Sequence, residues 1–142
     1  MAAATHRLRF LVEARADGRC EYCRRYQELI GDSFFEIEHI IPLARGGQTT
    51  PDNLALACRR CNLLKGVALE ARDPRTEQLV RLFNPRTDRW GVHFHRSRDL
   101  LRIYGRTAIG RATIALLRLN SQSEQRARQI QRDYLSGVFP LD

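Results

Sequence analysis

The stretch EHIIPLARGGQTTPDNLALACRRCNLLK, residues 38–65, contains the signals that decide the predicted fold. It includes a Cys-x-x-Cys pair at Cys58 and Cys61, and a second pair stands upstream at Cys20 and Cys23. Each pair has the spacing at which a tight turn presents two sulfurs to one tetrahedral ion. The four cysteines therefore predict a closed, structural Zn²⁺ site. Free buried thiols, a redox pair and an iron–sulfur cluster are the alternatives that the spacing leaves open.

Strand and loop signals alternate between the two cysteine pairs. Residues 34–41 are rich in aromatic and β-branched residues and predict a strand, and the apolar residues 54–57 predict a second. Pro42 and the Gly46-Gly47 pair open the loop between them. A short helix is expected over residues 60–69. Its buried face is expected to consist of Leu63, Leu64 and Val67.

Helices are also predicted on both sides of this segment. Residues 5–16 indicate a helix with Thr5 as its N-cap and Asp17-Gly18 as its stop. Downstream we expect a helix that starts at Asp73-Pro74 and ends near Asn84, followed by a β-hairpin over 90–103. Two further helices are expected, one over 107–119 and one that begins at Ser121 and Glu124 and ends near Gly137. We therefore expect one α+β domain over residues 1–142, with a core at about 18–70 and an extension of helices and hairpin packed on it at about 72–142.

The residues between the cysteines resemble the HNH endonuclease family. Glu38-His39, the Gly-Gly loop, Asn53-Leu54 and the Cys-x-x-Cys-Asn-x-x-Lys segment at 58–65 occur in the order that this family shows. The resemblance is close over residues 20–66 and implies a ββα-metal, treble-clef-like core. A weaker similarity over residues 83–120 is to the C-terminal extension of a bacterial subgroup of HNH proteins.

The resemblance implies a role for each matching side chain. His39 occupies the position of the general base, since a neutral imidazole can take a proton from water near neutral pH. Glu38 and Asn62 match the ligands of a catalytic divalent ion, and their oxygen atoms favour Mg²⁺ or Mn²⁺. Asn53 matches the residue that braces the loop or orients the histidine. Asn62 stands where many members have a last histidine, so the chain belongs to the H-N-N variant.

One geometric difficulty accompanies these roles. Neighbouring residues of a regular strand point to opposite faces, so Glu38 and His39 can flank one phosphate only at a strand end or bulge. Pro42 cannot continue a central strand and makes an early strand end plausible. Taken alone, Glu38 fits a solvent-facing strand residue and His39 a core histidine, and Asn53 and Asn62 fit turn or cap residues.

The charge distribution points to a polyanionic partner. The net charge is +8, and residues 72–132 contain 14 arginines against five acidic residues. Such a basic excess attracts nucleic acid. The residues predicted to contact it are Arg59, Arg60, Lys65, Arg86, Arg89, Arg96 and Arg98. For the first three of these, a solvated helix face is the alternative.

The sequence thus predicts a metal-dependent HNH endonuclease that nicks or cuts DNA, expected to be double-stranded. The rival is a zinc-stabilised module that binds nucleic acid without cutting it. No apolar run approaches the roughly 20 residues that a membrane span needs. Paired cysteines without a signal-peptide pattern favour a cytoplasmic protein, working as a monomer or homodimer.

Overall fold

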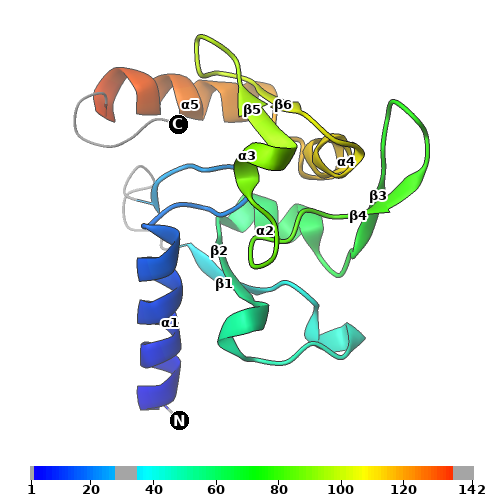
Figure 1. The fold of residues 1–142 in the computed structure, drawn as a ribbon. Helices are drawn as coiled ribbons and strands as arrows, with labels where there is room; N and C mark the ends of the chain where they lie inside the picture. Colours follow the sequence, from blue (N-terminus) through cyan, green and yellow to red (C-terminus); the bar gives the residue numbers. More distant parts are fainter. Residues whose placement is uncertain (1, 28–34, 136–142) are drawn as a thin grey trace. The chain divides into compact units, whose positions relative to one another are not determined.

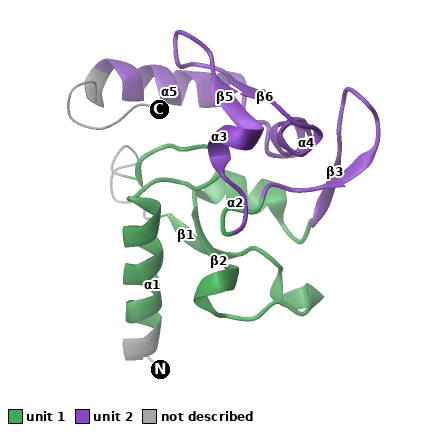
Figure 2. Cartoon of the chain, viewed as in Figure 1, with its two compact units in different colours: residues 1–68, 84–86 green, residues 69–83, 87–142 purple. Residues whose placement is uncertain are grey.

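The computed structural model describes residues 2–27 and 35–135. The chain divides into two compact units, one of residues 1–68 with 84–86 and the other of residues 69–83 with 87–142 (Figure 2). Helices and small antiparallel strand pairs make up both units, so the predicted α+β class is confirmed. Two expected boundaries, the strand start at Phe34 and the helix end near Gly137, lie outside the described residues.

The first unit begins with helix α1, Ala2–Ala16. The expected stop is confirmed, because Asp17 and Gly18 take left-handed φ angles of 56° and 67°. The Gly18 N–H then donates to the Glu13 carbonyl at 3.0 Å, as at many helix C-termini. Thr5 is not the N-cap, because the helix already runs through it.

The core of the first unit is a ββα segment (Figure 1). Strand β1, Glu36–His39, pairs antiparallel with β2, Leu54–Ala57, and β2 is buried along its whole length. Helix α2, Arg59–Lys65, follows after Cys58, whose sulfur caps it by accepting from the Cys61 N–H. Both α1 and α2 pack against this strand pair. Two 3-10 turns, η2 at Leu43–Arg45 and η3 at Pro51–Asn53, lie in the loop between the strands.

Helix α2 differs from its prediction in length and in its buried face. It ends at Lys65, and Leu63 is 66% exposed while Val67 is also exposed. The side chains that α2 buries are Cys61 and Lys65. The cysteine cluster and an ion pair, rather than an apolar stripe, therefore set its orientation.

The second unit starts with a hairpin where a helix is predicted. Strands β3, Glu70–Arg72, and β4, Leu79–Arg81, pair antiparallel, and Asp73 lies in the turn. Its carboxylate accepts from the Arg75 N–H and the Thr76 hydroxyl, as at a helix start, but also from Arg111. Asp73 therefore caps a turn, and the predicted helix is wrong.

The remaining elements follow the prediction more closely. The expected hairpin forms from β5, Phe94–Arg96, and β6, Ile103–Gly105, although Trp90–His93 is a short helix, α3. Helix α4, Ala108–Leu117, begins at Thr107, whose hydroxyl accepts from the Gly110 N–H. Helix α5, Gln122–Leu135, follows Ser121, whose hydroxyl accepts from the Glu124 N–H. In the described part of the chain no helix is long and apolar enough to span a membrane.

Candidate active site and cysteine cluster

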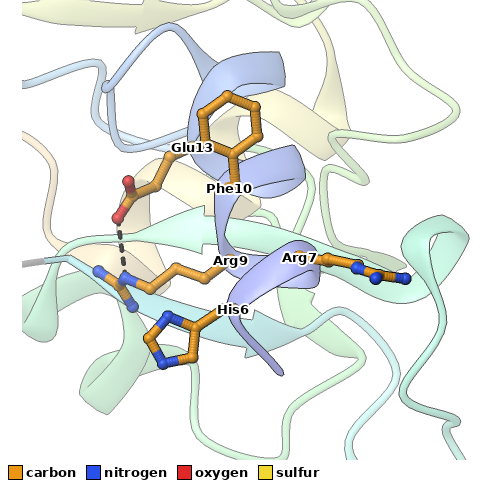
Figure 3. A pocket seen from close by; sticks show the side chains of 5 residues that line it. All are labelled: His6, Arg7, Arg9, Phe10 and Glu13. Atoms are coloured by element: carbon orange, nitrogen blue, oxygen red, sulfur yellow. Dashed lines mark ion pairs between the residues drawn. The ribbon is translucent and has the colours of Figure 1, made fainter. Parts of the chain in front are cut away.

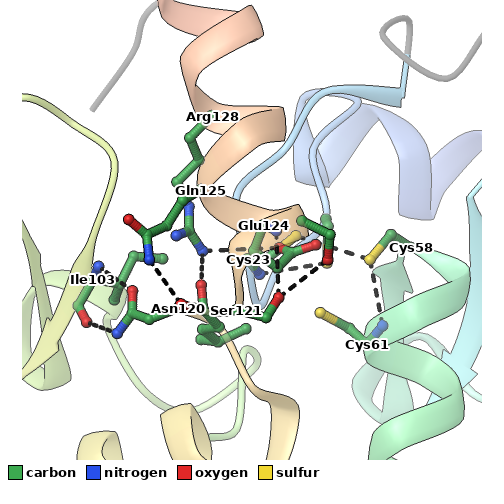
Figure 4. Close-up of polar contacts among 12 residues, drawn as sticks. Cys23, Cys58, Cys61, Ile103, Asn120, Ser121, Glu124, Gln125 and Arg128 are labelled. Atoms are coloured by element: carbon green, nitrogen blue, oxygen red, sulfur yellow. Dashed lines mark hydrogen bonds and ion pairs between the residues drawn. The ribbon is translucent and has the colours of Figure 1, made fainter.

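The four cysteines form one buried cluster in the first unit. Their sulfurs all lie within 4.8 Å of one another, and those of Cys23 and Cys58 are 3.8 Å apart. In each pair the second cysteine donates its N–H to the sulfur of the first, at 3.5 Å for Cys23 to Cys20. The distance is 3.4 Å for Cys61 to Cys58 (Figure 4). Four converging sulfurs fit a metal ion such as zinc.

The pKa values of the cluster thiols are shifted in opposite directions. Hydrogen bonds from the neighbouring cysteines lower the pKa of Cys58, whereas burial raises the pKa of Cys20. A metal bound here takes all four groups as thiolates. Four protein sulfurs are as many ligands as a closed tetrahedral site has.

The loop after β1 closes tightly upon itself through Asn53. The Asn53 side chain accepts from the Ile41 N–H at 2.8 Å and donates to the carbonyls of Ile41 and Gln48 at 3.0 and 2.8 Å. Asn53 thus links the segment after β1 to the loop backbone at Gln48.

Both glycines of this loop are required by its geometry. Gly46 has a left-handed φ of 87°, and a Cβ at Gly47 would stand 1.7 Å from the Ile41 carbonyl oxygen. Only glycine accepts both conditions without strain. The Gly-Gly pair therefore keeps the loop close to the end of β1.

His39 is the last residue of β1 and is half-buried. Its Nε2 lies 2.9 Å from the hydroxyl of Thr49, which belongs to the closed loop. Sequence reasoning did not identify Thr49, because nothing in a single sequence links it to a histidine ten residues earlier. Strand β1 ends at His39, which is the strand end that the geometry of Glu38 and His39 requires.

Glu38 lies on the opposite face of β1 and is only 3% exposed. Its Oε1 is 2.6 Å from Lys65 Nζ, and its Oε2 accepts from the Tyr22 hydroxyl at 2.6 Å. Burial raises the pKa of Glu38, while the lysine and the tyrosine oppose that rise. With both oxygens engaged and an ammonium beside it, this carboxylate does not fit a ligand of a divalent cation in the described arrangement.

Asn62 lies on α2, one residue after Cys61, and is half-buried. Its backbone groups serve the helix, donating to Cys58 and accepting from Gly66. The described residues give its side chain no hydrogen bond.

The structure corrects two of the predicted nucleic-acid contacts. Lys65 is 3% exposed and belongs neither to a phosphate-binding rim nor to a solvated helix face. Arg86 is largely buried and pairs with Glu21. Arg59, Arg89 and Arg98 are exposed, as phosphate contacts require, and Arg60 and Arg96 are half-buried. Tyr22, which sequence reasoning missed, stands inside the first Cys-x-x-Cys pair.

A separate, open depression lies on α1 in the first unit (Figure 3). Its lining residues are His6, Arg7, Arg9, Phe10 and Glu13. Arg9 pairs with Glu13 at 2.8 Å, one helical turn away. One helix supplies all of these side chains, and they do not converge on a common point as the cysteines do.

One segment of the chain, which contains the cysteine cluster and His39, matches a known protein family. Residues 20–67 match the model of the family described as HNH endonuclease. No curated protein and no solved structure matches the chain. The matched segment includes both cysteine pairs, His39, Asn53 and Asn62, and the family implies a nucleic-acid substrate.

Proposed function

Because residues 20–67 are a domain of the HNH endonuclease family, we propose that this protein hydrolyses phosphodiester bonds in DNA, with His39 as the general base. The supporting observation is the placement of His39 at the open end of β1, against a loop that Asn53 and two glycines hold closed. A zinc ion at the four cysteines holds the ββα segment together.

The chemistry at His39 is the activation of water. Thr49 lies within hydrogen-bond distance of Nε2 and orients the ring, and among the described residues nothing binds Nδ1. Nδ1 then takes a proton from water as the water oxygen attacks phosphorus. The bond to the leaving sugar oxygen breaks, and that oxygen takes up a proton from solvent to become the hydroxyl end. By family resemblance the products carry 5′-phosphate and 3′-hydroxyl ends.

The proposal includes a divalent ion, Mg²⁺ or Mn²⁺, which supplies charge neutralisation at the phosphate when bound. Asn62 offers one oxygen donor, and such ions commonly complete their shell with water and substrate phosphate. Glu38 is left out of this set because of its buried partners.

A plasmid assay tests the proposed function. Zinc-loaded protein is incubated with supercoiled plasmid in the presence of Mg²⁺ or Mn²⁺, and with a chelator as the control. We expect nicked circles to form before linear DNA, since one chain has one cleavage centre. Binding of the plasmid without any nicking would instead favour the rival function, a zinc-stabilised binding module.

A further inference from the structure

Three buried polar side chains meet beneath the end of β1. Glu38 forms an ion pair with the Lys65 ammonium at 2.6 Å and accepts a hydrogen bond from the Tyr22 hydroxyl at 2.6 Å. Each of the three residues is at most 3% exposed. Buried charges are kept in proteins only when they are paired and hydrogen-bonded. Glu38 is paired with the Lys65 ammonium at Oε1 and hydrogen-bonded to Tyr22 at Oε2, while Oε1 has the ion pair but no hydrogen bond of its own among the described residues.

Lys65 has a second bond that reaches past His39. Its Nζ donates to the Ile40 carbonyl at 2.8 Å. Lys65 therefore contacts both neighbours of His39, namely the carboxylate of Glu38 before it and the backbone carbonyl of Ile40 after it. Strand β1 ends at His39, and the next residue is held on both of its backbone groups, since the Ile40 N–H donates to the Asn53 carbonyl at 2.9 Å and its carbonyl accepts from Lys65.

The same side chains connect His39 to both halves of the cysteine cluster. Tyr22 lies between Cys20 and Cys23, and Lys65 is the last residue of the helix that Cys58 caps. Glu38 thus joins the two cysteine pairs through one carboxylate.

We infer that Tyr22, Glu38 and Lys65 form a positioning network that fixes the strand end carrying His39, and that Glu38 is not a ligand of the divalent ion. The inference rests on the proposed role of His39 as the base. Tyr22, Glu38 and Lys65 are accordingly positioning residues, which act on the reaction through His39 and do not touch the DNA.

The first test follows the His39 ring directly by NMR in the zinc-loaded full chain. Tyr22→Phe removes one hydrogen bond with little change in volume, and Lys65→Met removes the cation and the bond to Ile40. We expect both changes to shift the His39 imidazole and Ile40 amide signals. Tyr26→Phe, at another buried tyrosine, and Leu63→Met, on the exposed face of α2, are the matched controls and leave these signals in place.

Unchanged His39 signals in a folded Tyr22→Phe protein would overturn the network. If Lys65→Met does not fold, the double variant Glu38→Gln/Lys65→Met removes both charges together and gives the same readout. This test needs no cleavage activity. Its failure is therefore distinguishable from failure of the proposed nuclease function.

A second test separates positioning from ligation. Mn²⁺ is titrated into zinc-loaded wild type and Glu38→Gln, and binding is followed by the electron paramagnetic resonance of free Mn²⁺. A positioning role predicts that the two dissociation constants agree within about threefold. A loss of tenfold or more in Glu38→Gln, or tighter binding in Lys65→Met, would identify Glu38 as a ligand and overturn the inference.

Discussion

Asn53 bonds to both backbone groups of Ile41, accepting from its N–H at 2.8 Å and donating to its carbonyl at 3.0 Å. The Asn53 side chain thereby pairs with the N–H and the carbonyl of one loop residue, as a neighbouring strand does in a sheet. Since Ile41 lies two residues after His39, this bond sets the path of the chain away from the proposed base.

Replacing Asn53 by Ala should therefore damage both stability and activity. Three hydrogen bonds are lost, and at about 0.5–1.5 kcal/mol for each, the free energy of unfolding should fall by about 1.5–4.5 kcal/mol. Plasmid nicking is expected to fall at least tenfold. Asn53→Asp keeps the acceptor for the Ile41 N–H, so its losses of stability and of nicking rate should be smaller. Equal nicking rates of wild type and both variants would show that the loop does not need these hydrogen bonds.

Removal of one cysteine ligand should unfold the first unit. Cys58→Ser is expected to lose the metal, measured as about one zinc per chain in wild type, together with hydrogen-exchange protection of the β1 and β2 amides. Ala57→Ser changes a neighbouring buried residue and should keep its zinc. A metal-free Cys58→Ser protein with protected β1–β2 amides would show the site to be dispensable.

Asp73 makes the stability of the second unit sensitive to acid. Hydrogen bonds from Arg111 hold the pKa of Asp73 well below its usual range. A carboxyl with a lowered folded-state pKa stabilises the fold fully above its unfolded pKa of about 3.9, and this contribution disappears as the pH falls through that value toward the folded pKa.

We therefore expect Asp73→Asn to lower the melting temperature at pH 7, and we expect its difference in melting temperature from wild type to begin to shrink as the pH falls below about 4. Fluorescence of Trp90, the one tryptophan of the chain, reports on the second unit. Glu77→Gln, an exposed change in the same turn, serves as the control. If the difference in melting temperature between wild type and Asp73→Asn does not shrink on acidification, the stabilising role assigned to the ionised Asp73 is contradicted.

How far the sequence predicts the structure depends on how local each signal is. Strand β2 matches residues 54–57 because apolar residues stand between Asn53 and the metal knuckle. The hairpin over residues 70–81 could not be predicted, since Asp73 has a helix-start pattern and its partner Arg111 is distant in sequence. The burial of Lys65 was missed for the same reason, because its partner Glu38 lies on another element.

Exposed arginines of the second unit are expected to hold the DNA backbone. Arg89→Gln and Arg98→Gln, made separately, should each weaken binding on unrelated sequences alike and reduce the slope of log K against log salt by up to about 0.9. The matched control, Arg7→Gln, removes an exposed cation from α1. Equal slope changes in all three variants would reject a binding face in the second unit.

The measurement that tests the central claim most directly is the single-turnover nicking rate of His39→Ala at saturating plasmid, beside wild type and His6→Ala. His6 is an exposed histidine of α1 and controls for the loss of an imidazole. If His39 is the general base, His39→Ala should be slower by at least about 10²-fold, with zinc content and DNA affinity unchanged, while His6→Ala matches wild type. A His39→Ala rate within a few-fold of wild type would contradict the account.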